Sequence, residues 1–223
     1  MINTIIDKIR NFNMVPYLII FYSVGIAGLI IPQTRALFIA LVPLNLILNI
    51  GLLFIYHGRI DLGFVWKAGV VFVAGILVEM IGVNTGLIFG DYNYGPTLGL
   101  QINHTPLMIG ANWLMLVYAS LVITSKYFEK QYFRVLVAAV TMVIYDFALE
   151  PSAIAMDMWD WGGPVPLQNY VAWLVISLIL IWFADVTRMV NRKNKIAPAL
   201  FFVQLVFFIL LNTWRFISEV WEF

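Results

Sequence analysis

Seven apolar segments, each about as long as a bilayer-spanning helix, follow one another along the chain and constrain its fold. A helix needs ~20 mostly apolar residues to cross the hydrocarbon core of a membrane. The segments are residues 15–32, 36–56, 64–83, 106–124, 134–152, 167–187 and 197–217. The chain is 62% hydrophobic and 11% charged, whereas soluble domains carry about 25% charged residues. We therefore expect an all-α polytopic membrane protein, with seven transmembrane helices in a single integral membrane domain over residues 1–223.

The positions of lysine and arginine predict how these helices are oriented. Cytoplasmic loops carry an excess of basic residues. If the N-terminus is cytoplasmic, only Arg35 and Arg215 among the 13 basic residues fall on the other side. The cytoplasmic set is Lys8, Arg10, Arg59, Lys67, Lys126, Lys130, Arg134, Arg188, Arg192, Lys193 and Lys195. We predict a cytoplasmic N-terminus, an extracytoplasmic C-terminus and location in the cell inner (plasma) membrane.

Two loops on the predicted extracytoplasmic side contain no lysine or arginine and are rich in acidic and aromatic residues. The first covers residues 82–105 and follows Glu79, near the end of the third segment. The second covers residues 151–169 and follows Asp146 and Glu150 of the fifth segment. The aromatic side chains could form an interfacial belt, which is the usual role of tyrosine and tryptophan there. Alternatively, they could line a site and stabilise a cation through their negative ring faces.

The two loops end in a similar pattern. Pro106 and Pro166 each open the next helix, and Trp113 and Trp173 each lie seven residues beyond the proline. Proline suits the first turn of a helix, because its missing N–H would be unpaired there. The match is compatible with two parallel structural repeats that enclose a site. A match this short also arises by chance.

The three acids that precede the loops are the candidate catalytic residues. Asp146 and Glu150 are four residues apart and so share one helix face. Mutual repulsion and burial should keep one of the pair protonated near neutral pH, as a general acid requires. An intramembrane acid such as Asp146 is usually functional; its alternative role is to pair with a buried amide such as Asn45 or Asn112. The alternative for Glu79 and Glu150 is an interfacial position in contact with water.

Two polar residues of the sixth segment have predicted structural roles. Asn169, at its start, could cap the helix or donate a hydrogen bond to an acid. Asp185, near its cytoplasmic end and close to Arg188, is interpreted as part of an interfacial ion pair.

Several kinds of site are not expected. The chain has no cysteine, which excludes disulfides and thiolate chemistry. His57 and His104 are predicted on opposite sides, so no shared metal site is expected. The glycine-rich first loop lacks the Gly-x-Gly-x-x-Gly spacing and a nearby basic residue that a nucleotide would need. The basic residues are scattered, so no nucleic-acid surface is expected.

The two loops and their acids resemble the signature of the carotenoid biosynthesis membrane proteins, a family that includes the carotenoid 1,2-hydratases, or bisanhydrobacterioruberin hydratases. The resemblance covers residues 60–190. Its first block is Glu79-x-x-Gly82-x-x-Thr85-Gly86-x-x-Phe89-Gly90-x-Tyr92-x-Tyr94. Its second block is Asp146, Glu150-Pro151, Trp159-x-Trp161, Pro166-Leu167-x-Asn169 and Trp173.

The resemblance implies hydration of the terminal double bond of an acyclic carotenoid, a lycopene-type isoprenoid, to a tertiary alcohol. The expected partners are membrane lipid, the carotenoid and water, and the reaction needs no redox cofactor. Asp146 and Glu150 are expected to donate the proton and stabilise the cation, and Glu79 to position or deprotonate water. Candidate substrate-binding residues are Thr85, Phe89, Tyr92, Tyr94, Asn112, Trp113, Asp157, Trp161, Asn169 and Trp173. The alternatives are a carotenoid cyclase that uses the same cation, and a non-catalytic carotenoid or lipid carrier.

Overall fold

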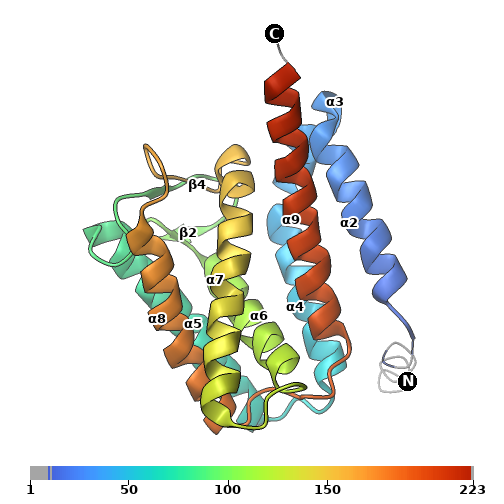
Figure 1. The fold of residues 1–223 in the computed structure, drawn as a ribbon, viewed down its shortest axis with the longest axis vertical. Coiled ribbons are helices and arrows are strands. Elements are labelled where there is room, and N and C mark those ends of the chain that lie inside the picture. Colours follow the sequence, from blue (N-terminus) through green and yellow to red (C-terminus); the bar gives the residue numbers. More distant parts are fainter. Residues whose placement is uncertain (1–9, 11, 222–223) are drawn as a thin grey trace.

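Helices run the length of the molecule, and short strands connect them at one end (Figure 1). The computed structural model describes residues 10 and 12–221. The helices are α2 (Val15–Ile30), α3 (Pro32–Ala40), α4 (Val42–His57), α5 (Leu62–Thr85), α6 (Leu107–Thr124), α7 (Gln131–Ala155), α8 (Leu167–Val186) and α9 (Ile196–Trp221). The strands are β1 (Asn93–Tyr94), β2 (Gln101–Ile102), β3 (Thr105–Pro106) and β4 (Trp159–Asp160).

The predicted all-α class is confirmed, and the chain is a multi-pass membrane protein. Among the described residues, the five helices from α5 to α9 are each long and apolar enough to cross a membrane. The predicted segment 36–56 is a bent pair instead, because α3 and α4 meet at 53° and count as one span at most. Proline lies at the first or second position of both α3 and α4, which suits a new helix start. Helix α2 has only 16 residues, so the number of seven spans is not confirmed.

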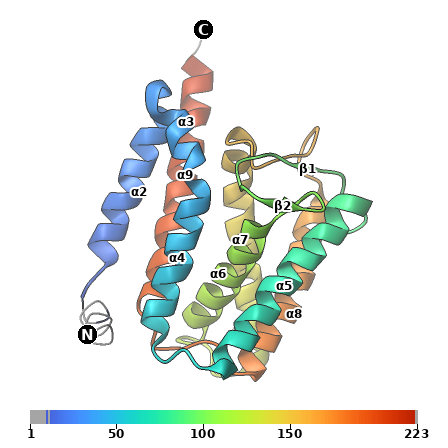
Figure 2. The same cartoon turned by 180° about the vertical axis from the view of Figure 1, so that it is seen from behind.

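The two acid- and aromatic-rich loops meet at the end of the molecule where the C-terminus lies (Figures 1 and 2). Strand β1 of the first loop pairs antiparallel with β4 of the second, with Tyr94 opposite Trp159. The α4–α5, α6–α7 and α8–α9 connections lie at the other end. Lys8 lies outside the described residues. The orientation of this bundle in a membrane stays a prediction.

Helix α6 is the centre of the bundle. Every residue from Ile109 to Thr124 is buried, because α6 packs against α4, α5, α7, α8 and α9. A helix that is apolar all round suits such a position. Gly110 lets α5 come close, since a Cβ there would lie 2.7 Å from the Phe72 carbonyl oxygen. This close packing places Asn112 and Trp113 of α6 beside the acid-bearing helices.

At the end opposite the loops, Asp185 forms the predicted ion pair, but with different partners. Arg134 binds it through two nitrogens, with Nε–Oδ1 and Nη2–Oδ2 distances of 2.9 and 2.6 Å. The half-exposed Arg192 adds a contact of 3.0 Å to Oδ1. The expected partner, Arg188, follows α8 in a left-handed turn with φ 51°. The pair therefore joins α7 to α8 inside the protein.

Candidate active site

Glu79, in the last two turns of α5, is buried and held by three aromatic donors. The hydroxyls of Tyr92 and Tyr94 both donate to Oε2 at 2.7 Å, and Trp113 Nε1–H donates to Oε1 at 2.8 Å. The two tyrosines are two residues apart in an extended segment, so they face the same side. With an exposed fraction of 3%, Glu79 is not an interfacial acid in water, and that alternative is wrong.

The phenols of Tyr92 and Tyr94 stay protonated in this environment. Burial raises the pKa of both above the ordinary value of 10.0, and the neighbouring Glu79 carboxylate raises it further. They are thus permanent hydrogen-bond donors to Glu79. Gly82 makes room for this arrangement, because a Cβ there would lie 2.4 Å from the Phe89 ring.

Glu150, near the end of α7, has a matching cradle. Trp159 Nε1–H and Trp161 Nε1–H donate to its Oε2 at 2.8 and 3.1 Å. These two tryptophans are again two residues apart, on and just after β4. Asn169 Nδ2 lies 3.3 Å from the other oxygen, Oε1. Glu150 is 3% exposed, so its alternative as a water-facing acid is also wrong.

Asp146 differs from the two glutamates, because one of its oxygens has no partner. Asn169 Nδ2 donates to Oδ2 at 2.9 Å, whereas the buried Oδ1 accepts no hydrogen bond from the described residues. Asn169 is therefore a donor and not a cap, since Pro166 holds the N-cap position of α8. The suggested amide partners of Asp146 do not pair with it: Asn45 bonds to Tyr22 instead, and Asn112 faces another cavity.

The two halves of the site are joined through their aromatic rings. Trp113 and Trp173 stack, with centroids 4.1 Å apart and planes at 16°. Tyr92 and Trp161 lie with centroids 4.9 Å apart. Helices α5 and α7 run toward the loops and α6 and α8 run back (Figure 1). A rotation axis along the bundle would relate the α5–α6 pair to the α7–α8 pair. The same axis would make β1 and β4 antiparallel, as observed. These contacts support the predicted internal repeat.

A cavity of about 20 Å³ lies between the three carboxyl groups. A water molecule needs about 10–15 Å³ of such space and two to four polar partners, so the cavity has room for about one water. The predicted residues that line it are Glu79, Phe89, Tyr92, Tyr94, Asp146, Glu150, Trp161, Asn169 and Trp173. Trp113 contributes through its bond to Glu79. Ile109 and Trp159 also line this cavity and are not among the predicted site residues, although the Trp-x-Trp spacing places Trp159 and Trp161 on one side.

Three predicted binding residues lie elsewhere. Thr85 is exposed, and its hydroxyl donates to the Ile81 carbonyl of its own helix. Asp157 is exposed in a left-handed turn with φ 54°. Asn112 lines a second, larger cavity. In the described part of the chain, no group of three or more histidine, aspartate or glutamate side chains is arranged to hold a metal ion.

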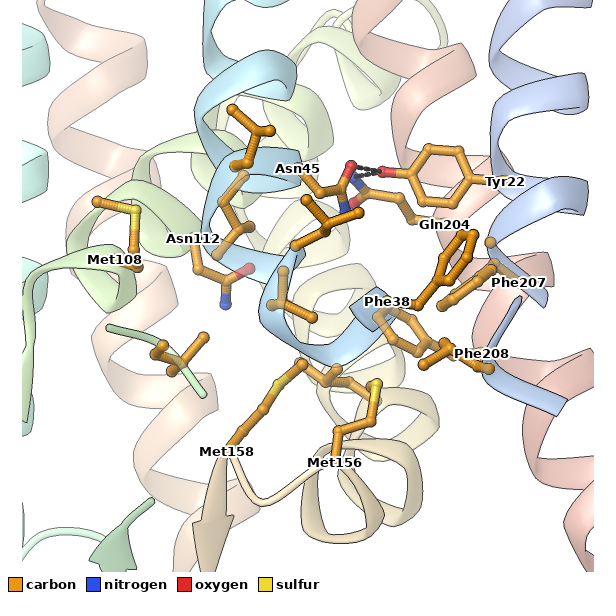
Figure 3. A pocket seen from close by; sticks show the side chains of 18 of the residues that line it. Tyr22, Phe38, Asn45, Met108, Asn112, Met156, Met158, Gln204, Phe207 and Phe208 are labelled. Carbon is orange, nitrogen blue, oxygen red and sulfur yellow. Dashed lines mark hydrogen bonds between the residues drawn. The ribbon is translucent and has the colours of Figure 1, made fainter. Parts of the chain in front are cut away.

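The second cavity has a volume of about 210 Å³ and lies between α2, α4, α6, α7 and α9. Its walls are mostly apolar, with a polar corner where Tyr22, Asn45 and Gln204 meet (Figure 3). Tyr22 donates to Asn45 and accepts a hydrogen bond from Gln204 at 2.7 Å. This corner is not among the predicted sites, although polar residues within apolar segments are a signal for it.

Comparison with known proteins found one family model and one curated relative that match the chain. The family model of carotenoid biosynthesis proteins matches residues 38–221. The chain is 28% identical over 166 residues to a bisanhydrobacterioruberin hydratase of Haloarcula japonica. The matched region covers 65% of this chain and 55% of that relative, so the chain spans little more than half of the relative's length. No solved structure matches the chain.

Proposed function

We propose that this chain, which belongs to the carotenoid biosynthesis protein family, adds water to the terminal C1,C2 double bond of an acyclic carotenoid. One observation carries the proposal. Asp146, Glu150 and Glu79 surround a cavity with room for about one water, and Asp146 alone has a free carboxyl oxygen there. If Asp146 is protonated at Oδ1, no described residue accepts a hydrogen bond from this acidic O–H, which stays available to the substrate. An unactivated alkene needs such a proton donor.

The reaction balances with carboxyl groups and water alone. The Asp146 proton moves to C2 of the alkene, and the π electrons form the new C–H bond. A water oxygen then forms a bond to the tertiary cation at C1, and a carboxylate takes the proton that the water loses. Transfer of that proton back to Asp146 completes the cycle, so the net change is the addition of one water.

Glu79 is the proposed acceptor of the water's proton. Its three donors are all aromatic O–H or N–H groups, an arrangement that stabilises a carboxylate. Among the described residues, only Trp113 donates to its Oε1, which leaves the second lone pair of that oxygen for the water's proton. Glu150 shares Asn169 with Asp146 and is the proposed counter-charge for the cation. The ring faces of Tyr92, Trp161 and Trp173 would add cation–π stabilisation.

The substrate suits a membrane site of this kind. A carotenoid polyene is about as long as the hydrocarbon core is thick, ~30 Å, so most of it can stay in lipid. Only its end must reach the carboxyl groups near the loops. In this proposal water comes from the loop side, where several loop residues are exposed.

The test is expression in a lycopene-producing host, with products identified by mass. A product heavier by one water supports hydration, an isomer of lycopene would indicate a cyclase, and unchanged bound pigment would indicate a carrier. Asp146→Asn keeps an oxygen for the Asn169 bond but removes the acidic proton. Loss of a general acid lowers rates by about 10²–10⁴-fold.

Asp157→Asn is the matched control, because Asp157 is exposed and lies outside the cavity. Asparagine also tolerates the left-handed backbone of position 157. The control should keep the wild-type product level. The assignment fails if Asp146→Asn, inserted in the membrane at the control's level, forms product at the control's rate.

A further inference from the structure

The 210 Å³ cavity has exposed wall residues on the side of the bundle. Its wall includes Phe21 and Val24 of α2 and Leu44 and Leu48 of α4, and all four are about half exposed. Exposed apolar side chains on these helices face the lipid in a membrane protein. The opening therefore lies between α2 and α4, where a hydrophobic ligand can enter without crossing water.

The same cavity reaches the carboxyl site at its inner end. Ile109 and Trp159 line both the large cavity and the small one that holds the three acids. One layer of side chains thus separates the two spaces. Trp159 is part of this layer and also donates to Glu150, so the partition is tied to the acid site.

The size of the cavity limits what it can hold. A cavity of about 150 Å³ accommodates benzene. On that scale, 210 Å³ accommodates about eight carbon atoms, or between one and two isoprene units. A whole polyene would not fit, so the rest of the chain would have to lie in the lipid outside the α2–α4 opening.

One polar side chain is aimed into this space. Asn112, 7% exposed, points into the cavity and makes no side-chain hydrogen bond with the described residues (Figure 3). Because the amide faces the open cavity, a ligand group or water there can complete its hydrogen bonding. It is three residues from Ile109 on α6, so it lies on the same helix face as the partition.

We infer that this cavity is the binding chamber for the terminal segment of an acyclic isoprenoid chain, which enters from lipid between α2 and α4. The inference rests on the proposed function for the identity of the ligand. The chamber delivers the end group to the partition formed by Ile109 and Trp159. Asn112, in the chamber wall, can bond the hydroxyl that hydration leaves on the end group.

The test blocks the opening from the lipid side. Val24→Trp and Leu44→Trp each enlarge a side chain at the mouth. Ile20→Trp and Ile47→Trp are matched controls on the same helices, with similar exposed fractions of 60% and 54% but outside the chamber wall. All four are made in the Asp146→Asn chain, which should bind substrate without converting it. The readout is lycopene retained per protein after purification from the producing host.

The mouth variants should retain at least about fivefold less lycopene than their controls, because a bulky ring excludes the chain. Equal retention in mouth and control variants would overturn the chamber, as would a parent protein that retains no lycopene. The proposed function is tested separately, by measuring hydrated product from the same variants with Asp146 intact. Retention that falls only in the mouth variants, without any hydrated product from the Asp146-intact chain, would refute the hydratase and leave the chamber standing.

Discussion

The cradle of Glu79 permits a double-mutant cycle with a defined magnitude. Tyr92→Phe and Tyr94→Phe each remove one hydroxyl and keep the buried ring. Both hydroxyls donate to the same oxygen at 2.7 Å. A hydrogen bond to a charged group contributes about 1.5–3 kcal/mol, so each single variant should lose about 2 kcal/mol of unfolding free energy. In each single variant, the remaining phenol still satisfies Oε2.

The double variant leaves Oε2 without any donor. The penalty of an unsatisfied buried group, about 1–3 kcal/mol, then adds to the two lost bonds. The total should reach at least about 5 kcal/mol, which exceeds the additive value of about 4 kcal/mol by a coupling of about 1 kcal/mol or more. Unfolding free energies in mild detergent, measured by titration with a denaturing detergent, give all four corners of the cycle.

Tyr127→Phe is the control, because this hydroxyl is exposed at the opposite end of the bundle and should matter by less than about 0.5 kcal/mol. Two results would refute the reasoning. Single losses below about 0.5 kcal/mol would mean that the phenols do not stabilise a carboxylate. A double loss equal to the sum of the singles would mean that the two bonds are independent.

Three further predictions concern stability. Asp185→Asn leaves Arg134 buried without its counter-ion and should cost about 3–5 kcal/mol, whereas removing the half-exposed Arg192 should cost less than about 1 kcal/mol. Detergent unfolding measures both, and equal losses would contradict a buried pair. Gly75→Ala should cost about 1–3 kcal/mol, because its Cβ would lie 2.8 Å from a Trp113 carbon, while Gly69→Ala on the same helix meets no atom within 4 Å and should be neutral or stabilising. In alkaline titration, the raised pKa of the two cradle phenols contributes stability that is complete below pH 10.0 and is lost above it, as the unfolded chain ionises first. The tyrosinate absorbance of these two residues is the difference between wild type and the double phenylalanine variant. It should appear only when the protein unfolds. Its appearance while the circular dichroism is unchanged would contradict this prediction.

The sequence predicts most of the residues that line the small cavity, because its signals are local. Acids at the ends of apolar segments and aromatic residues two apart in the following loops are visible without a structure. Most of them indeed meet at one cavity. Thr85 and Asp157 lie in the same stretches yet outside it, because a helix terminus and a left-handed turn direct them outward. Nearness in sequence does not fix the direction of a side chain.

Hydropathy alone does not predict the larger cavity or the exact number of spans. The chamber wall brings α2 and α9 together, from opposite ends of the chain, as the bond between Gln204 and Tyr22 shows. The bend between α3 and α4 interrupts a segment whose apolar composition is continuous. Hydropathy records that such a segment is buried in lipid or protein, but it does not record whether one helix or two short ones form it.

The internal repeat shows where the site is asymmetric. Glu79 and Glu150 occupy matching places, and the residues four positions before them are Gly75 and Asp146. In α5 the glycine leaves space for Trp113, which fills it and donates to Glu79. In α7 the same place carries a carboxyl group, and Trp173 stacks on its counterpart without a side-chain hydrogen bond to the described residues. Aromatic pairs from the loops hold both glutamates, so that part of the site is duplicated. The repeat also does not duplicate the carboxyl group of Asp146, whose Oδ1 has no partner among the described residues, and this is the group a proton transfer to an alkene would need.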